Sequence, residues 1–258
     1  MIHPTAIIDP AARLGRNVSV GAYAVIGPQV EIGDNTEISN HVTIMGPTLI
    51  GRDNLFYSTC SIGQDPQDKK FKRGETQSRL EIGDNNTFRE FVTINRGSEA
   101  GGGITRLGNN NWIMANCHIA HDCQVGRNTV FAVGAIIAGH VTIGDFVTLG
   151  GFTAIHQFCS VGEYTITGGQ TLIAQDVPPY VVANGNRVRL FGVNKVGLER
   201  NGLTPDEVSE IQKAYKIIFR SKLPQKEALA RVGSELGGSP RAMRLVEFIQ
   251  TSTRGICR

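Results

Sequence analysis

The chain has 258 residues, of which 40% are hydrophobic, and this predicts a globular protein of one large or two smaller domains. A net charge of +3 is too small to indicate nucleic-acid binding. No run of about 18 apolar residues and no signal-peptide pattern occurs, so we expect a cytoplasmic protein without stable membrane insertion. The 31 glycines and the single tryptophan predict many tight turns around a narrow core.

From the N-terminus, a large apolar residue recurs every six positions. The first run comprises Ile2, Ile8, Leu14, Val20, Ile26, Ile32, Ile38, Ile44, Ile50, Phe56 and Ile62. The register breaks at 64–79 and again at 96–106, then continues from Leu107 to Val161, misses Thr167 and returns at Ile173. A helix of 3.6 residues per turn could not keep a period of six over this length, so short β-strands are predicted.

A second register, four residues after the first, holds small side chains. It comprises Thr36, Val42, Thr48, Cys60, Cys117, Cys123, Thr129, Ala135, Val141, Val147, Thr153, Cys159 and Thr165. Glycines also recur 18 residues apart, as in Gly108, Gly126 and Gly144, and mark one corner per coil. Three hexads per coil predict a triangular prism of stacked parallel strands whose interior takes both registers.

Beyond residue 190 the hexad ends and helix signals begin. Thr204-Pro205-Asp206-Glu207 forms a capping box with proline at the first helical position. Pro224 and Pro240 are expected to open two more helices. We therefore predict a β-helix over 1–190, with insertions near 64–79 and 96–106, and a helical domain over 191–258.

The stretch NCHIAHDCQVG, residues 116–126, contains two histidines, an aspartate and two cysteines, all side chains that can take part in catalysis or bind metals. Because residues 18 apart are neighbours in an unbroken prism, two columns are predicted: His121–Gly139–Gln157 and Asp122–His140–Phe158. His156 lies beside Gln157. None of these residues is on an inward register, so the imidazoles are expected to cluster outside one corner.

Four interpretations of this stretch compete. The cysteines occupy the small inward register, which favours reduced thiols in the core over a thiol nucleophile. A metal site requires ligands that converge on one point, whereas the columns spread the imidazoles along the prism, so no metal is predicted. Corner histidines without any role are a further alternative. Acid–base chemistry by a histidine is favoured, with Asp122 as the orienting partner if the corner lets adjacent side chains meet.

The hexad pattern resembles the hexapeptide-repeat acyltransferases, and this resemblance implies a left-handed β-helix, although the crossover rule would favour the right hand. Further strings are similar to the UDP-N-acetylglucosamine 3-O-acyltransferases of lipid A biosynthesis over essentially the whole chain. These strings are HPTAIIDPAA, SIGQDPQDKKFKRGE, VTINRG, HIAHD, AGHVTIGD, HQFCSVG, AQDVPPYVVANGN and STRGICR.

The resemblance implies transfer of an (R)-3-hydroxyacyl group from acyl carrier protein to the sugar 3-hydroxyl, without a cofactor. It also implies a homotrimer with sites between subunits. His121 takes the role of general base, and the Gly139 N–H that of oxyanion donor. The residues matched to substrate binding are Asp68, Lys70, His118, His140, His156, Gln157, Asn194 and Arg200.

Two positions refine this expectation. Gly169 matches the residue that gauges acyl length, and a glycine there predicts a chain of about fourteen carbons rather than about ten. Val196 and Arg200-Asn201 depart from the family pattern of an acidic residue and paired basic residues. Nucleotide contacts there are expected to be rearranged.

An acidic carrier protein would dock on a basic surface. Two such surfaces are predicted: Arg241, Arg244, Arg254 and Arg258 in the tail, or Lys213, Lys216 and Arg220 on the first helix. Three alternative functions remain open from the sequence. They are an N-acyltransferase acting on an amino sugar nucleotide, a zinc enzyme like the γ-carbonic anhydrases, and a non-enzymatic hexapeptide scaffold.

Overall fold

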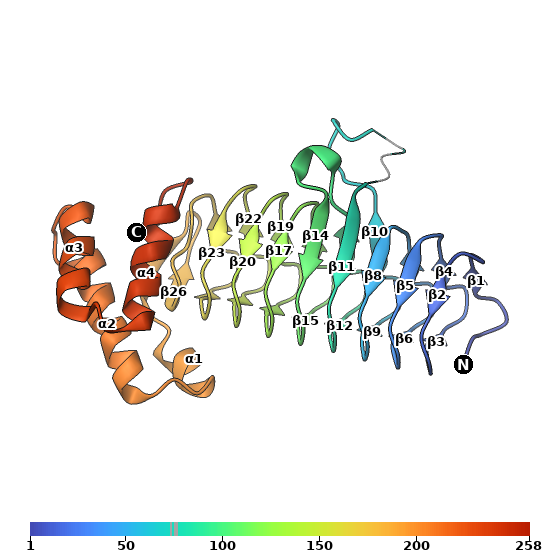
Figure 1. Ribbon diagram of the computed structural model, residues 1–258, viewed down its shortest axis with the longest axis horizontal. Coiled ribbons are helices and arrows are strands. Elements are labelled where there is room, and N and C mark those ends of the chain that lie inside the picture. The colour runs from blue at the N-terminus through green and yellow to red at the C-terminus, as the bar shows by residue number, and fades with distance from the viewer. Residues whose placement is uncertain (73, 75–76) are drawn as a thin grey trace.

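The protein is an elongated prism with a bundle of helices at its C-terminal end (Figure 1). The computed structural model describes residues 1–72, 74 and 77–258. Arg73, Glu75 and Thr76, which belong to the insertion expected near 64–79, lie outside the described residues. No helix in the described part of the chain is long and apolar enough to cross a membrane.

Each coil contributes one short strand to each of three sheets. The first sheet contains β1 (Ile7–Ile8), β4 (Val25–Ile26), β7 (Thr43–Ile44), β10 (Ser61–Gln64), β13 (Thr93–Asn95), β16 (His118–Ile119), β19 (Ile136–Ile137), β22 (Ala154–Ile155) and β25 (Leu172–Ile173). The second contains β2 (Arg13–Leu14), β5 (Val30–Ile32), β8 (Thr48–Ile50), β11 (Arg79–Ile82), β14 (Ile104–Leu107), β17 (Gln124–Val125), β20 (Thr142–Ile143) and β23 (Ser160–Val161).

The third sheet continues to the end of the prism. It contains β3 (Ser19–Val20), β6 (Glu37–Ile38), β9 (Leu55–Phe56), β12 (Thr87–Phe88), β15 (Trp112–Ile113), β18 (Val130–Phe131), β21 (Thr148–Leu149), β24 (Ile166–Thr167), β26 (Val181–Asn184) and β27 (Arg189–Val193). Its last two strands pair antiparallel, whereas the other neighbours in the three sheets are parallel.

The pairing register has the predicted repeat of 18 residues. His118 pairs with Ile136, and Ile136 pairs with Ala154. Both inward registers fill the core, since the small one is buried throughout and the large one is buried from Val20 onward. The large register is incompletely buried only in the first coil, at the open end of the prism, where Ile2 is 52% exposed. Thr167, which misses the apolar pattern, is also buried, and its hydroxyl lies 2.9 Å from that of Thr153.

The three corners of the prism are built from residues with left-handed backbone angles. The first corner contains Asp122, His140 and Phe158, with φ between 60° and 66°. The second contains Asn116, Gly134, Phe152 and Gln170, and the third contains Asn128, Phe146 and Tyr164. Asparagine and aspartate tolerate these angles well, but the aromatic residues and His140 require support from the stack above and below them.

Four α-helices close the C-terminal end. They are α1 (Lys195–Arg200), α2 (Pro205–Arg220), α3 (Gln225–Leu236) and α4 (Pro240–Thr251). The predicted capping box is present, because the Thr204 hydroxyl accepts from the Glu207 N–H and the Glu207 carboxylate accepts from the Thr204 N–H. The sequence reasoning missed α1, a six-residue helix that Asn194 caps.

The C-terminal tail returns to the prism. The Asp176 N–H donates to the Gly255 carbonyl at 2.8 Å, and the Asp176 carboxylate accepts from Ser252 Oγ at 2.6 Å and from the Ser160 N–H at 2.7 Å. These contacts bring the Arg254 guanidinium within 3.3 Å of His156 Nδ1.

Candidate active site

Two segments outside the repeat rise from the same edge of the prism (Figure 1). One follows β10 and contains residues 65–72, and the other follows β13 and includes the short 3-10 helix η1 (Glu99–Gly101). The two segments contact each other, because Arg96 forms an ion pair with Asp65 at 2.8 Å and the Asn95 side chain donates to the Asp65 carbonyl at 2.9 Å. Together they form a wall beside the first corner.

A cleft of about 270 Å³ lies between this wall and the first corner. Its lining residues are Asp68, Lys70, Phe71, Ser98, Ala100, Gly101, His121, His140, Gln157 and Phe158. Five of the predicted site residues therefore meet in one cleft: Asp68, Lys70, His121, His140 and Gln157. A larger groove of about 780 Å³ follows the second sheet, but no histidine or cysteine lines it, so we place the chemistry in the smaller cleft.

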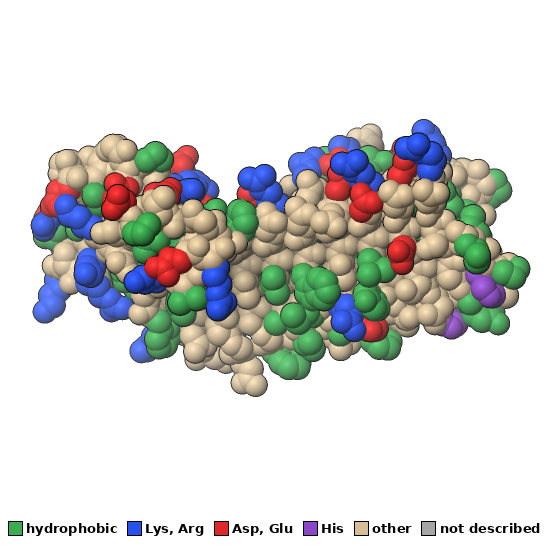
Figure 2. Space-filling view, turned by 90° about the horizontal axis from the view of Figure 1, so that it is seen from below, with side chains coloured by type: hydrophobic (Ala, Val, Ile, Leu, Met, Phe, Trp, Pro, Cys, Tyr) green, Lys and Arg blue, Asp and Glu red, His purple; other side chains and the backbone are tan. Residues whose placement is uncertain are grey.

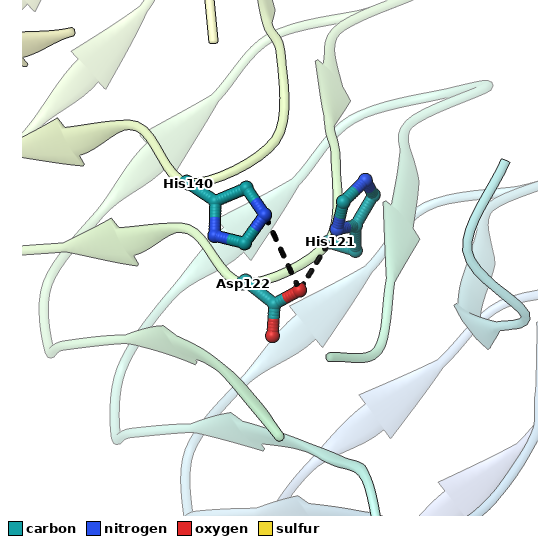
Figure 3. Close-up of side chains that lie close together, drawn as sticks. All are labelled: His121, Asp122 and His140. Atoms are coloured by element: carbon teal, nitrogen blue, oxygen red, sulfur yellow. Dashed lines mark hydrogen bonds and ion pairs between the residues drawn. The ribbon is translucent and has the colours of Figure 1, made fainter. Parts of the chain in front are cut away.

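His121 and Asp122 form a hydrogen-bonded pair in this cleft (Figure 3). His121 Nδ1 lies 2.8 Å from Asp122 Oδ2. Adjacent residues in an extended strand point to opposite sides, but Asp122 has φ of 60°, and this corner conformation turns its carboxylate toward the imidazole. The condition set by the sequence, a corner that lets the two side chains meet, is fulfilled.

The Asp122 carboxylate is almost completely buried, with 2% of its side chain exposed. Ser98 donates to it from its hydroxyl at 2.7 Å and from its N–H at 3.0 Å. Burial opposes the charge, but the hydrogen bonds from His121 and Ser98 outweigh it, so the pKa of Asp122 lies below its usual value. An ionised Asp122 favours the His121 tautomer with the proton on Nδ1 and a free lone pair on Nε2.

Gly139 lies directly against the His121 ring, as the column predicted. The His140 N–H donates to the His121 carbonyl at 3.0 Å, and the Phe158 N–H donates to the Gly139 carbonyl at 3.1 Å. A Cβ atom at Gly139 would lie 2.8 Å from His121 Nε2, so only glycine leaves room for the ring. Among the described residues, no acceptor takes a hydrogen bond from the Gly139 N–H.

His140 approaches the same carboxylate from the next coil (Figure 3). Its ring stacks on Phe158 at 4.4 Å and crosses the His121 ring at 5.2 Å, and its Nε2 lies 3.9 Å from Asp122 Oδ2. Burial lowers the pKa of His140 despite the nearby charges of Asp122 and Asp68. The sequence argument that the columns spread the imidazoles apart was wrong here, because the left-handed corner turns His140 back toward Asp122.

Two further histidines lie outside the cleft lining. His118 is on the outer face of β16, where its Nδ1 lies 2.7 Å from the Thr93 hydroxyl, and burial lowers its pKa. His156 is exposed, with its Nδ1 3.1 Å from the Gln157 carbonyl.

The remaining predicted residues, Gly169, Asn194 and Arg200, lie away from the first corner. Gly169 precedes Gln170 in the second corner, and a Cβ atom there would meet only the Gly151 carbonyl, at 3.5 Å. Asn194 lies against the third corner and donates from its side chain to the Tyr164 carbonyl at 2.8 Å. Arg200 is the last residue of α1. One chain therefore does not gather all the predicted substrate residues around the cleft.

Sequence reasoning missed Ser98, Phe71 and Gly101 as parts of the site. All three belong to the segments outside the repeat, where the register of 18 gives no neighbours. A Cβ atom at Gly101 would lie 2.0 Å from Asp122 Oδ2, so the backbone there closes directly over the carboxylate.

The four cysteines of the repeat are core residues, as predicted, and Cys257 in the tail is buried as well. All five are buried and unpaired. Burial raises the pKa of the Cys60 and Cys123 thiols to about 12 and that of Cys117 to about 11. Thiols of this kind carry almost no thiolate at neutral pH and are poor nucleophiles.

Comparisons with known proteins agree with this architecture. The family profile "Bacterial transferase hexapeptide (six repeats)" matches residues 11–46 and 104–139, and "Udp N-acetylglucosamine O-acyltransferase; Domain 2" matches residues 176–257. The acyl-[acyl-carrier-protein]–UDP-N-acetylglucosamine O-acyltransferase of Herminiimonas arsenicoxydans is 50% identical over 262 residues, covering 100% of this chain and 99% of that protein. The enzyme of the same name from Thermodesulfovibrio yellowstonii is 48% identical, with the same coverage.

Solved structures also resemble this chain over its full length. The UDP-N-acetylglucosamine acyltransferase of Francisella novicida superposes with a TM-score of 0.97 at 39% identity, covering 100% of this chain and 94% of that one. The corresponding protein of Acinetobacter baumannii gives 0.96 at 44% identity, covering 100% and 99%.

The prism of hexads and the histidine-lined cleft thus define a hexapeptide-repeat acyltransferase with a left-handed β-helix. Within that class, the chain belongs to the family of acyl-[acyl-carrier-protein]–UDP-N-acetylglucosamine O-acyltransferases.

Proposed function

We propose that this protein transfers an (R)-3-hydroxyacyl group from acyl carrier protein to the 3-hydroxyl of UDP-N-acetylglucosamine, the first step of lipid A biosynthesis. The names of its relatives specify an acyl-carrier donor and this sugar nucleotide as acceptor. The observation that carries the proposal is the pairing of His121 with a buried, ionised Asp122 in a cleft that also presents the free Gly139 N–H. A base and an oxyanion donor side by side are the requirements of acyl transfer to a hydroxyl.

The reaction needs no covalent enzyme intermediate. His121 Nε2 accepts the proton of the sugar 3-hydroxyl while that oxygen attacks the thioester carbonyl. The Gly139 N–H donates to the oxyanion of the tetrahedral intermediate, and Asp122 stabilises the imidazolium through Nδ1. When the C–S bond breaks, the departing pantetheine thiolate takes the proton from His121, so the histidine returns to its starting form.

The other polar groups of the cleft position the substrates in this proposal. Asp68 and Lys70 face the first corner from the wall, and Gln157 continues the His121 column two coils further on, beyond Gly139. His118, on the sheet face that leads into this corner, and His156, beside Gln157, extend the binding surface along the prism. We propose that no cofactor takes part, because the phosphopantetheine arrives on the carrier protein.

A homotrimer would complete the site. Gly169 lies by the second corner and Asn194 by the third, whereas His121 is at the first. Neighbouring prisms packed around a threefold axis would bring different corners together and supply these residues to one substrate. Large exposed apolar side chains support such packing, among them Trp112, Val133, Ile136 and Phe152. Figure 2 shows hydrophobic side chains gathered on the underside of the middle coils, as expected of a protein–protein interface.

The tail is the better candidate for docking the acidic carrier. On α2, the helix that carries the other predicted surface, Lys213 is already paired with Glu235 at 2.8 Å. In the tail, Arg241 and Arg244 are also paired with acids, whereas Arg254 lies 3.3 Å from His156 beside the cleft and Arg258 donates to the neutral Gln225 side chain. We infer that Arg254 and Arg258 contribute most to docking, in the cytoplasm where the acyl carrier protein acts.

An acyl-transfer assay tests the function. Purified protein is incubated with UDP-N-acetylglucosamine and (R)-3-hydroxyacyl carrier proteins of several lengths, and the product is identified by mass spectrometry. We expect an ester at the 3-oxygen and a preference for about fourteen carbons, since Gly169, the proposed length gauge, has no side chain that would shorten an acyl groove. Acylation only of the 3-amino analogue would identify an N-acyltransferase instead, and activity that requires stoichiometric zinc would identify a metalloenzyme.

A further inference from the structure

We propose that His121, Asp122 and His140 also form a binding site for a zinc ion, and that zinc bound there reversibly inhibits the enzyme. The binding site follows from the geometry alone, whereas the inhibition rests on the proposed role of His121 as the base. Nothing in acyl transfer requires this site, so zinc would act as a regulator or inhibitor and not as a cofactor.

The three side chains offer a ligand set suited to zinc. Their possible ligand atoms, two imidazole nitrogens and one carboxylate oxygen, all lie within 4.8 Å of one another. In tetrahedral zinc sites with bonds of about 2.0–2.1 Å, neighbouring ligand atoms are about 3.3 Å apart. The Nδ1–Oδ2 distance of 2.8 Å would have to open slightly, and the Nε2–Oδ2 distance of 3.9 Å would have to close (Figure 3). Both changes are of the size that side-chain rotation provides.

The surroundings hold these ligands in place before any metal binds. Ser98 fixes the Asp122 carboxylate with two hydrogen bonds, and Phe158 supports the face of the His140 ring. His121 and His140 line the cleft, so a fourth coordination position would face its open space. Asp68 and Lys70, which line the cleft beside the histidines, have opposite charges, and the ionised carboxylate of Asp122 next to His121 would attract a cation.

Zinc at this position would remove the general base by changing its tautomer. In the free protein the proton of neutral His121 is on Nδ1, and the lone pair of Nε2 is available. Zinc binds a nitrogen through its lone pair, so binding at Nδ1 obliges the neutral ring to carry its proton on Nε2. The ring neither gains nor loses a proton overall. The nitrogen that must accept the sugar proton is now protonated and cannot do so.

The chain offers a matched control at another corner. His41 has φ of 58° and stacks on Tyr23 at 5.3 Å, just as His140 has φ of 62° and stacks on Phe158. Asparagine accepts such left-handed angles readily, so His140→Asn and His41→Asn should both fold. Only the first removes a ligand of the proposed site.

The test is isothermal titration calorimetry of ZnCl2 into the full-length protein after treatment with EDTA and gel filtration. We expect one zinc per chain in the wild type and in His41→Asn, and affinity at least about tenfold lower in His140→Asn. In the transfer assay, zinc should inhibit the wild type, EDTA should restore its activity, and His140→Asn should need at least about tenfold more zinc for the same fractional inhibition.

Several results would overturn the proposal: no zinc binding by the wild type, equal affinity in His140→Asn and wild type, or activation by zinc. Asp122→Asn removes another proposed ligand, so calorimetry should show weaker zinc binding by this variant as well. Thermal unfolding checks that the variant is folded. If the protein binds zinc as expected but transfers no acyl group, the binding site stands and the proposed function fails. The two failures are therefore distinguishable.

Discussion

The carboxylate of Asp122 accepts a hydrogen bond from the imidazole of His121 at 2.8 Å, although the two residues are adjacent in the sequence. The contact depends on the left-handed conformation of Asp122, which a corner of the prism imposes once per coil. It also depends on Ser98, which comes from outside the repeat and shields the carboxylate from water. The base and its orienting acid are therefore products of the corner geometry.

Replacing Asp122 with asparagine should impair the chemical step. The amide keeps the shape of the side chain but loses the charge that stabilises the imidazolium, so we expect kcat to fall by at least about 10²-fold with little change in KM. Steady-state kinetics separates the two effects. Asp53→Asn is the control, because Asp53 is an exposed corner aspartate with φ of 57°. An equal loss in both variants would contradict the assigned role.

Removal of the general base should lower kcat strongly while the protein remains folded. We expect His121→Ala to lower kcat by about 10²–10⁴-fold, since proton transfer in the transition state contributes factors of this size. Single-turnover kinetics measures the loss, and thermal unfolding checks that the variant remains folded. Near-full turnover in a folded His121→Ala protein would exclude the mechanism.

A methyl group at Gly139 should displace the catalytic ring. The new Cβ would lie 2.8 Å from both Cε1 and Nε2 of His121, closer than van der Waals contact allows. We expect Gly139→Ala to lower kcat/KM by at least about tenfold, the cost of misplacing a reacting group. Gly151→Ala is the control, because its Cβ would meet only the Val133 carbonyl at 3.4 Å. The role of Gly139 is rejected if both variants keep wild-type kinetics.

Acyl-chain length should respond to Gly169. The fold tolerates a side chain there, because a Cβ would meet only the Gly151 carbonyl, at 3.5 Å. We expect Gly169→Met to shift the preferred donor from about fourteen carbons to a shorter chain by filling the end of the acyl groove. Competition between donors of different length gives the ratio of kcat/KM values. An unchanged preference would show that Gly169 does not gauge length.

The buried thiols should be unreactive in the native protein and should destabilise it at high pH. Burial raises the pKa of the Cys60, Cys123 and Cys257 thiols to about 12 from the model-peptide value of 9.0. The folded state then binds more protons than the unfolded state between these values, so stability is complete below pH 9 and is lost as the pH rises toward 12. Iodoacetamide at pH 8 should label the native chain much more slowly than the denatured chain. Rapid native labelling would contradict the assigned burial.

The repeat of six predicted the triangular prism, its coil length and part of the site, whereas the left hand of the β-helix came from the family resemblance. Because each coil is a translated copy of the last, residues 18 apart must be neighbours, and this placed Gly139 against His121 without any coordinates. The capping box at Thr204, Pro224 before α3 and Pro240 at the start of α4 could also be recognised in the sequence, because helix caps are local signals. The short α1 was not, since six residues with a central Gly197 give no periodicity to detect.

The sequence by itself therefore determined what repeats: the prism, its buried registers and the columns of side chains on its surface. Tertiary structure decided what does not repeat. The wall that places Ser98 over Asp122 comes from segments outside the register, and the left-handed corner that turns Asp122 and His140 toward His121 is a backbone angle that neither residue type reveals. The distribution of Gly169, Asn194 and His121 over three corners likewise follows only from the closed triangle, because a corner exists only after three strands have turned through it.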